Sequence, residues 1–355
     1  MKADISARAM DLLRLVCDTP GVSGFEGPIQ AVVRAELERS CDEVRMDRMG
    51  NLIAVKRARK APAGEPALKV MLAAHMDEIG FVVRHIDAAG FVRLLPIGGY
   101  DPRTLIAERV VIHGRTDIPG IIAPQPNWIL SDEEKKRVLP VQELFVDTGL
   151  PGESVRSQVA LGDPISFAQR FDRLGGETVV GRNFDDRLGV FAMLEAVRRL
   201  GEIGVDLYAV ATVQEELGVR GAEIAAYAVE PDVGIAIDGS LASDVPYAKE
   251  EDRHCSLGLG TGIYLVDNRT VSDPLLVRFL MKLADEKGIR YQRNLGGGTD
   301  ASAMQRNKTG ARACTIGAPT RYMHSTSQLA DLRDLEETAR LLAAFVENAH
   351  LGGLR

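Results

Sequence analysis

Short, almost wholly apolar runs alternate with amphipathic stretches along much of this chain. The runs at 69–74, 207–213 and 232–237 have the length of strands, and their lack of polar positions suits strands that are covered on both faces. Between them, apolar residues recur at helical spacing, as they do over 190–197. This alternation predicts an α/β fold with an open mixed sheet flanked by helices.

The same pattern places further elements around these three strands. The last predicted helix begins with Asp334 and Glu337 as a capping-box-like pair. The other predicted helices cover 5–17, 27–38, 222–227 and 274–287, and further strands are predicted within 47–56 and at 311–316.

The middle of the chain has a different texture. Over 78–172, apolar and polar residues alternate in short stretches separated by turn residues, and no long helix is predicted. His85 and His113 lie in these stretches without an evident acidic or histidine partner at ligand spacing, so both are interpreted as structural. The pattern predicts a small β-barrel-like domain, inserted into an α/β domain made of 1–77 and 173–355.

Composition narrows the possible functions. The 355 residues carry a formal net charge of −7, which argues against a general nucleic-acid binder. No apolar run approaches the length of a membrane span, and the first residues lack a signal-peptide core, so a cytoplasmic protein is expected. The four cysteines lack the spacing of a zinc knuckle or a disulfide framework.

Potential ligands follow each of the three apolar strands. His75 comes directly after the first, Glu215 and Glu216 after the second, and Asp238 after the third. In an open α/β sheet, ligands bind outside the carboxyl ends of the strands. A pair of glutamates alone would more often open a solvated surface turn, but three strands that end in this way predict a polar cluster.

The residue types of this cluster favour a metal site. Asp185, at the start of a predicted helix, and His324, in a loop, extend the set. Imidazole and carboxylate donors without thiolates suit catalytic zinc, cobalt or manganese, since closed structural zinc sites usually include cysteine. There are more acids than one ion requires, which points to two divalent metal ions. Asp186 is expected to cap the helix or to form an ion pair.

Several short motifs occur in order along the chain. They are Ser23-Gly24-Phe25-Glu26, His75-Met76-Asp77, Asp185-Asp186-Arg187, Gln214-Glu215-Glu216 with Gly218 and Arg220-Gly221, Asp238, Gly297-Gly298-Thr299-Asp300-Ala301, and Arg321-Tyr322-Met323-His324-Ser325. Together they resemble the motif set of the M42 family of dinuclear-metal aminopeptidases. That family includes the tetrahedral aminopeptidases and relatives once labelled cellulase M or endoglucanase, and the resemblance covers nearly the whole chain.

The resemblance implies a role for each residue of the cluster. His75 and Asp238 would hold one metal ion. Glu216 and His324 would hold the other, and Asp185 would bridge the two ions.

The resemblance also implies the activity. Such an enzyme removes amino-terminal residues from short peptides, with a metal-activated bridging water and Glu215 as general base and then general acid. Asp77 would orient His75 from behind, as metal-bound histidines commonly require. The resemblance further implies a large homo-oligomer, a dodecamer built from dimers through the inserted domain.

Two stretches depart from the family pattern. After His324, Thr326 and Gln328 stand where the family carries a proline and a glutamate. The stretch 124–128, Pro-Gln-Pro-Asn-Trp, replaces a Lys-Pro-Pro-His type of sequence. No ligand is lost by either change, so activity is still expected. Substrate preference and the packing of the insert are the properties that these departures put in question.

Other functions remain open from the residues alone. A related metal-dependent carboxypeptidase or N-deacylase would use a similar pair of ions on other amides. An endoglucanase needs two carboxylates but neither the histidines nor a bridging acid, and the chain has few aromatic residues for sugar stacking. A non-catalytic assembly protein on this fold would not need an intact ligand set.

Overall fold

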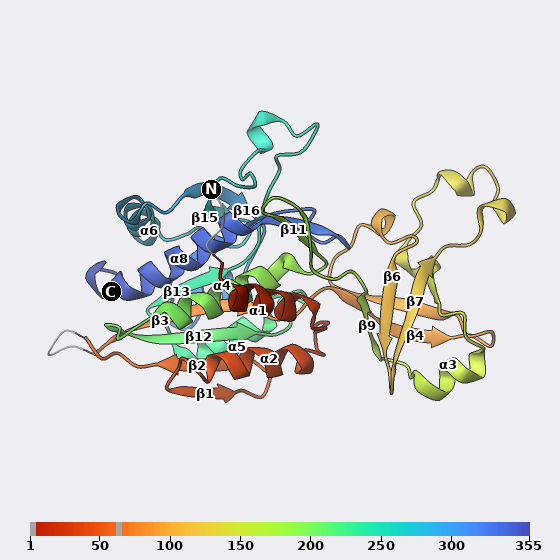
Figure 1. The fold of residues 1–355 in the computed structure, drawn as a ribbon, viewed down its shortest axis with the longest axis horizontal. Coiled ribbons are helices and arrows are strands. Elements are labelled where there is room, and N and C mark those ends of the chain that lie inside the picture. The colour runs from red at the N-terminus through yellow and green to blue at the C-terminus, as the bar shows by residue number, and fades with distance from the viewer. Residues whose placement is uncertain (1–4, 62–65) are drawn as a thin grey trace.

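A large mixed sheet forms the centre of the structure, a computed structural model that describes residues 5–61 and 66–355 (Figure 1). In order across the sheet, its strands are β1 (Glu43–Met46), β2 (Leu52–Lys56), β12 (Val205–Thr212), β3 (Leu68–His75), β13 (Val233–Ile237), β17 (Arg312–Gly317), β15 (Thr261–Asp267) and β16 (Tyr291–Gly296). The four central strands, β12 to β17, run parallel, and β1, β2 and β15 join antiparallel. The predicted open mixed sheet is confirmed.

The predicted apolar strands lie in the middle of this sheet and are covered on both faces. In β3, Leu72 belongs to the core on one face, whereas Met71 and Ala73 belong to the core on the other. Because both faces are dry, nearly every inner position of such a strand is apolar. The first face is covered by α1 (Ala7–Asp18), α2 (Gly27–Leu37), α4 (Phe184–Arg199), α6 (Pro274–Lys287) and α8 (Leu332–Asn348), and the second by α5 (Arg220–Val229) and α7 (Ala301–Gln305).

Two helices differ from their predicted form. The helix α4 is buried almost all round rather than on one face, because it lies between the sheet and helices α1 and α8. The helix α8 begins before Asp334, and the side chain of Asp331 caps it. Asp334 instead accepts hydrogen bonds from the amides of Gly258 and Gly260, 2.5 and 2.7 Å away. The capping-box prediction for Asp334 is therefore wrong.

The sequence pattern does not predict the second sheet of the structure. Its strands, in order, are β10 (Asp172–Gly175), β11 (Thr178–Gly181), β19 (Gln328–Asp331), β18 (Pro319–Arg321) and β14 (Ser240–Leu241). Each strand is very short, and paired residues such as Thr178 and Asp331 lie far apart in the sequence. This small sheet carries His324 in the loop between β18 and β19.

The chain between β3 and β10 forms a closed barrel that stands beside the large sheet (Figure 1). Around the barrel, the strands are β4 (Gly80–Ile86), β5 (Val92–Ile97), β8 (Phe145–Asp147), β7 (Asp117–Ala123), β6 (Arg109–His113) and β9 (Pro164–Phe167), and the helix α3 (Gly152–Gln158) contacts β4. Alternate residues of β7, such as Ile118 and Ile122, face the barrel core. The predicted barrel is confirmed.

His113 has an acidic partner that its sequence context did not suggest. Its Nδ1 lies 2.9 Å from Asp117 Oδ1, and its Nε2 lies 2.8 Å from Ser166 Oγ. These contacts connect β6 with β7 and β9, which agrees with a structural role.

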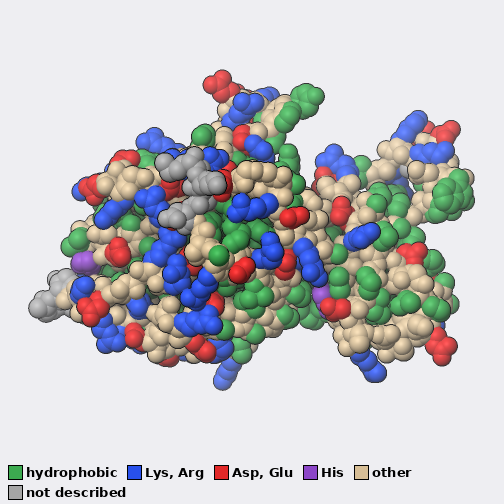
Figure 2. Space-filling model, viewed as in Figure 1, with side chains coloured by type: hydrophobic (Ala, Val, Ile, Leu, Met, Phe, Trp, Pro, Cys, Tyr) green, Lys and Arg blue, Asp and Glu red, His purple; other side chains and the backbone are tan. Residues whose placement is uncertain are grey.

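Exposed apolar side chains gather on the barrel and on the loop above it (Figure 2). Ile106, Ile121, Trp128, Ile129 and Val138 are all exposed, and Trp128 reaches 85%.

Within residues 5–61 and 66–355, no helix is long and apolar enough to cross a membrane. The short 3₁₀ helices are η1 (Pro102–Thr104), η2 (Asn127–Ile129), η3 (Glu134–Lys136), η4 (Val141–Glu143), η5 (Glu250–Asp252) and η6 (Ala349–Leu351).

Candidate metal centre

Three strands of the large sheet end side by side at one edge. His75 is the last residue of β3 and lies opposite the last residue of its parallel neighbour β12. Glu215 and Glu216 follow β12 after a short turn, and Asp238 follows β13, the other neighbour of β3. Because parallel strands end at the same edge of a sheet, these four side chains gather there, which is the arrangement that the sequence pattern predicts.

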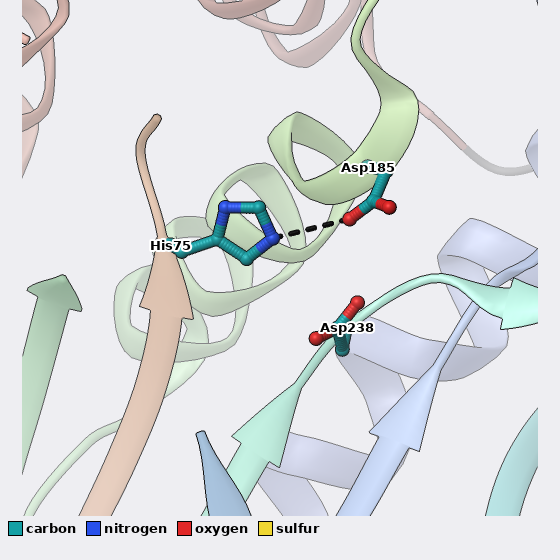
Figure 3. Close-up of side chains that lie close together, drawn as sticks. All are labelled: His75, Asp185 and Asp238. Carbon is teal, nitrogen blue, oxygen red and sulfur yellow. Dashed lines mark hydrogen bonds and ion pairs between the residues drawn. The ribbon is translucent and has the colours of Figure 1, made fainter. Parts of the chain in front are cut away.

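His75, Asp185 and Asp238 form one group of potential ligands (Figure 3). The ligand atoms that they offer lie within 4.8 Å of one another, and all three residues are buried. His75 Nε2 is 3.1 Å from Asp185 Oδ1. Since Asp185 comes from the start of α4, this group joins two strand ends to a helix.

Asp185, Glu216 and His324 form a second group of the same kind. His324 Nε2 lies 3.2 Å from Asp185 Oδ2 and 3.6 Å from Glu216 Oε1. Asp185 thus belongs to both groups and directs a different oxygen to each histidine. The structure brings the five residues proposed as ligands together, with Asp185 between the two pairs.

Buried carboxylates dominate the charge of the centre. Burial, followed by the charge of Asp185, raises the pKa of Glu216 to about 8, and burial raises the pKa of Asp238 well above its ordinary value. The hydrogen bond with Asp185 raises the pKa of His324 to about 9. Carboxylates packed this closely hold protons unless cations balance their charge. Their oxygens, together with two imidazole nitrogens, fit divalent ions of the zinc, cobalt or manganese type.

Asp77 lies behind both groups and is fully buried. Its main-chain oxygen is 3.1 Å from His75 Nδ1, and its carboxylate oxygen Oδ1 is 3.5 Å from the same nitrogen. The carboxylate also accepts hydrogen bonds from the amides of Glu215 and Glu216, 3.0 and 3.1 Å away. Asp77 is thus placed to orient His75, and in addition it fixes the turn that carries both glutamates.

Ser23 and Glu26 support the same turn, and sequence reasoning assigned neither a role. Ser23 Oγ donates a hydrogen bond to the carboxylate of Asp77. Glu26 Oε1 accepts a hydrogen bond from the amide of Gln214, 3.1 Å away and 188 positions along the chain. The Ser-Gly-Phe-Glu motif at 23–26 is the one signal in the sequence that could have found them.

Comparison with known proteins identifies the relatives of this chain. Residues 50–341 match the family model described as M42 glutamyl aminopeptidase. The chain belongs to the M42 family. The lysyl aminopeptidase of Pyrococcus furiosus is 36% identical to it over 353 residues, which cover 95% of this chain and 96% of that protein.

Solved structures of similar proteins share the whole fold of this M42 chain. The TET aminopeptidase from a marine sediment archaeon of the Thaumarchaeota has a TM-score of 0.93 at 31% identity, over 98% of this chain and 99% of that one. A TET peptidase of Pyrococcus horikoshii, which can assemble into a tetrahedron or a large octahedral shell, has a TM-score of 0.84 at 31% identity, over 95% and 99%. The predicted family and its aminopeptidase activity are confirmed.

Gln328, which departs from the M42 pattern, lies directly behind Asp185. Its Oε1 accepts a hydrogen bond from the amide of Asp185 at 2.9 Å, and its Nε2 donates to the carbonyl oxygen of Arg182 at 3.2 Å. An amide side chain can accept and donate at once, whereas an ionised glutamate cannot donate. This departure therefore bears on the placing of a potential ligand, in addition to the properties named above.

The side chain of Asp186 reaches into the first turn of α4. Its Oδ1 accepts a hydrogen bond from the amide of Gly189 at 3.1 Å. The approach is so close that a Cβ at position 189 would collide with the carboxylate, which explains the glycine there. Asp186 thus caps α4 and belongs to neither potential metal group of the described residues.

Proposed function

We propose that this M42 aminopeptidase binds two divalent metal ions, one held by His75 and Asp238 and the other by Glu216 and His324, with Asp185 shared. The observation that carries the proposal is that the two oxygens of Asp185 face separate histidines, 3.1 and 3.2 Å away. A carboxylate in that position can serve two ions at once. Zinc or cobalt suits the donor set best, and manganese is the alternative.

Glu215 is the proposed proton carrier. When bound, the ions would lower the pKa of a water molecule and polarise the scissile carbonyl group. Glu215 lines the cavity beside the donor groups without belonging to either, and the hydrogen bond from its amide to Asp77 fixes its backbone. Burial raises its pKa well above the ordinary value, which suits a carboxylate that takes a proton from water and passes it to the departing amine.

We further propose that residues 78–172 form a separate domain through which copies of the chain assemble. The apolar side chains of Ile121, Trp128 and Ile129 in this part of the chain are exposed and support this role, since exposed apolar surface often marks an interface. The related Pyrococcus horikoshii peptidase assembles into closed shells. A cytoplasmic location is also proposed, which the four free cysteines support because thiols stay reduced there.

Substrates that differ at the amino terminus test the proposed activity. Metal-loaded protein should cleave aminoacyl amides that have a free amine and leave N-blocked amides and soluble cellulose intact. Cleavage of blocked substrates alone would favour the carboxypeptidase or N-deacylase alternative. Cleavage of cellulose would favour the endoglucanase.

The variant Glu215→Gln tests the proposed proton carrier. It should lower kcat by about 10²–10⁴-fold, the usual contribution of a positioned acid–base group, and should leave the bound metal unchanged. Glu223→Gln, at an exposed glutamate of α5, is the matched control and should keep full activity. Wild-type turnover in Glu215→Gln would reject its assignment.

A further inference from the structure

A cavity of about 330 Å³ adjoins the candidate metal centre. Part of its lining is formed by Glu215 and by members of both donor groups. The rest of the lining, here called the far end, belongs to neither group and consists of Gly239, Leu241, Tyr264, Gly297, Gly298, Thr299 and Met323. A cavity of this size is at the lower limit for small-ligand sites and has room for little more than one residue of a peptide.

The side chains at the far end are apolar or have their polar atom engaged, as the hydroxyl of Thr299 is with Thr315 Oγ1 at 2.8 Å. Tyr264 is buried, and its hydroxyl donates a hydrogen bond to the carbonyl oxygen of Gly239 at 2.6 Å, so the ring presents carbon to the cavity. The side chain of Met323 lies over Gly239, where an added Cβ would come within 3.0 Å of its Cε. Leu241 completes the wall with a side chain that is 43% exposed. A thioether and two hydrophobic side chains make an adaptable apolar surface.

No charged side chain of the described part of the chain lines this far end. The carboxylates that line the cavity are the three proposed ligands and Glu215. Arg321 and Arg269 are not among the lining residues: Arg321 Nε donates to Asp244 Oδ1 at 2.8 Å, and the exposed Arg269 lies against Gly298. An ionised substrate side chain would enter without a partner, which is costly in a partly desolvated site.

We propose that this far end receives the side chain of the amino-terminal residue of the substrate and selects uncharged apolar side chains, such as those of leucine and methionine, over lysine and glutamate. The proposal rests on the proposed function, because the carbonyl group to be cleaved must lie beside Glu215. The α-carbon of the first residue then lies next to the donor groups, and its side chain has the adjoining cavity to enter. Leu241, Tyr264 and Met323 are thus specificity-determining residues.

A series of aminoacyl amides tests this selection on metal-loaded protein. The kcat/KM for leucyl and methionyl amides should exceed that for lysyl and glutamyl amides by at least about tenfold, since a pocket contact of this size is worth ten- to a few hundredfold. An equal or faster rate for the lysyl or glutamyl amide would overturn the proposal. If Arg269→Ala abolished such a glutamyl preference, the recognition would belong to Arg269 instead. Failure to cleave any free-amine substrate would contradict the proposed function itself.

A charge placed at the far end of the cavity tests whether this cavity selects the amino-terminal side chain. Leu241→Glu should raise the lysyl-to-leucyl ratio of kcat/KM by at least about tenfold, because the new carboxylate would pair with the lysine. Leu174→Glu is the matched control: Leu174 is also exposed and lies on β10, at the opposite edge of the same five-stranded sheet. An unchanged lysyl-to-leucyl ratio in folded Leu241→Glu would overturn the proposal. Leu-Xaa and Xaa-Leu dipeptides give a second test, since a selectivity that follows the second residue rather than the first would also overturn it.

Discussion

The two donor groups share Asp185 but are built in different ways. His75 and Asp238 follow neighbouring strands in the middle of the large sheet and are 2% and 7% exposed. His324 lies in a loop of the small sheet, with a φ of 57° and a side chain that is 43% exposed. Its Nδ1 lies 3.2 Å from the carbonyl oxygen of Gly99, which follows the barrel strand β5. The sheet therefore fixes the first group, whereas loops from three parts of the chain assemble the second.

The stability lost when each histidine is replaced should show the difference between the two groups most strongly. Burial lowers the pKa of His75, but hydrogen bonds with Asp185 and Asp77 outweigh it and raise the pKa well above the ordinary value. We therefore expect the metal-free protein to hold a charged imidazole beside Asp185, in a buried ion pair. His75→Ala should lower the free energy of unfolding of the metal-free protein by about 3–5 kcal/mol. His324→Ala removes a partly exposed pair and should lower it by about 1 kcal/mol or less. Urea unfolding measures both.

The cost of His75→Ala should also depend on pH. A group whose pKa is higher in the folded protein stabilises it fully below the unfolded pKa, about 6.5 for histidine, and this contribution is lost as the pH rises through the folded pKa. The difference between wild type and His75→Ala should therefore be largest below about pH 6.5 and shrink in alkaline solution. Equal losses for the two histidine variants at low pH would contradict the comparison.

Asp77 contacts both donor groups, so its loss should weaken metal binding at both. Asp77→Ala should weaken metal binding at each group by about 10–100-fold, the usual effect of losing a residue that orients a ligand. Asp77→Asn keeps an acceptor oxygen and should have a smaller effect. Competition titration with a chromophoric chelator resolves the two binding steps. His75→Ala identifies the binding step that depends on the first group. If Asp77→Ala weakens only that step, the contacts of Asp77 to the amides of Glu215 and Glu216 do not contribute to metal binding.

Gln328 supports Asp185, the residue that both donor groups share. We expect its replacement to have the smallest effect on stability. Gln328→Glu keeps an acceptor for the amide of Asp185 but loses the donor to Arg182, which should lower the free energy of unfolding by about 1 kcal/mol. Because a protonated glutamate can donate again, the loss should diminish as the pH falls. Thermal unfolding at several pH values measures it. A deficit that stays constant with pH would argue against the lost donor as its cause.

Much of the centre of the fold could be predicted because it depends on local patterns. The central strands carry continuous apolar runs, and parallel strands must end at one edge, so His75, Glu216 and Asp238 could be placed near one another without coordinates. The pattern could not place Asp185 and His324, which are brought in by α4 and by the small sheet. They could be added to the set as residues of loops, but only the resemblance to a family gave each a role.

The contacts behind the ligands could not be predicted, because they depend on pairings between distant parts of the chain. Gln328 reaches Asp185 across 143 positions, and Ser23 reaches Asp77 across 54. The strands of the small sheet are too short for a periodic signal, and β15 and β16 were missed as well. The cap of α8 was misplaced because Asp334 is used by a loop that folds over the helix, which no local pattern records.

The shared position of Asp185 is the central claim, and metal counting tests it most directly. After loading with zinc or cobalt and removal of free ions, mass spectrometry under non-denaturing conditions should find two ions per chain in the wild type. Asp186→Asn, which changes the neighbouring helix cap, should also retain two. We predict that Asp185→Ala loses both ions, because each group gives up one of its three ligands. Two ions still bound to folded Asp185→Ala would contradict the account.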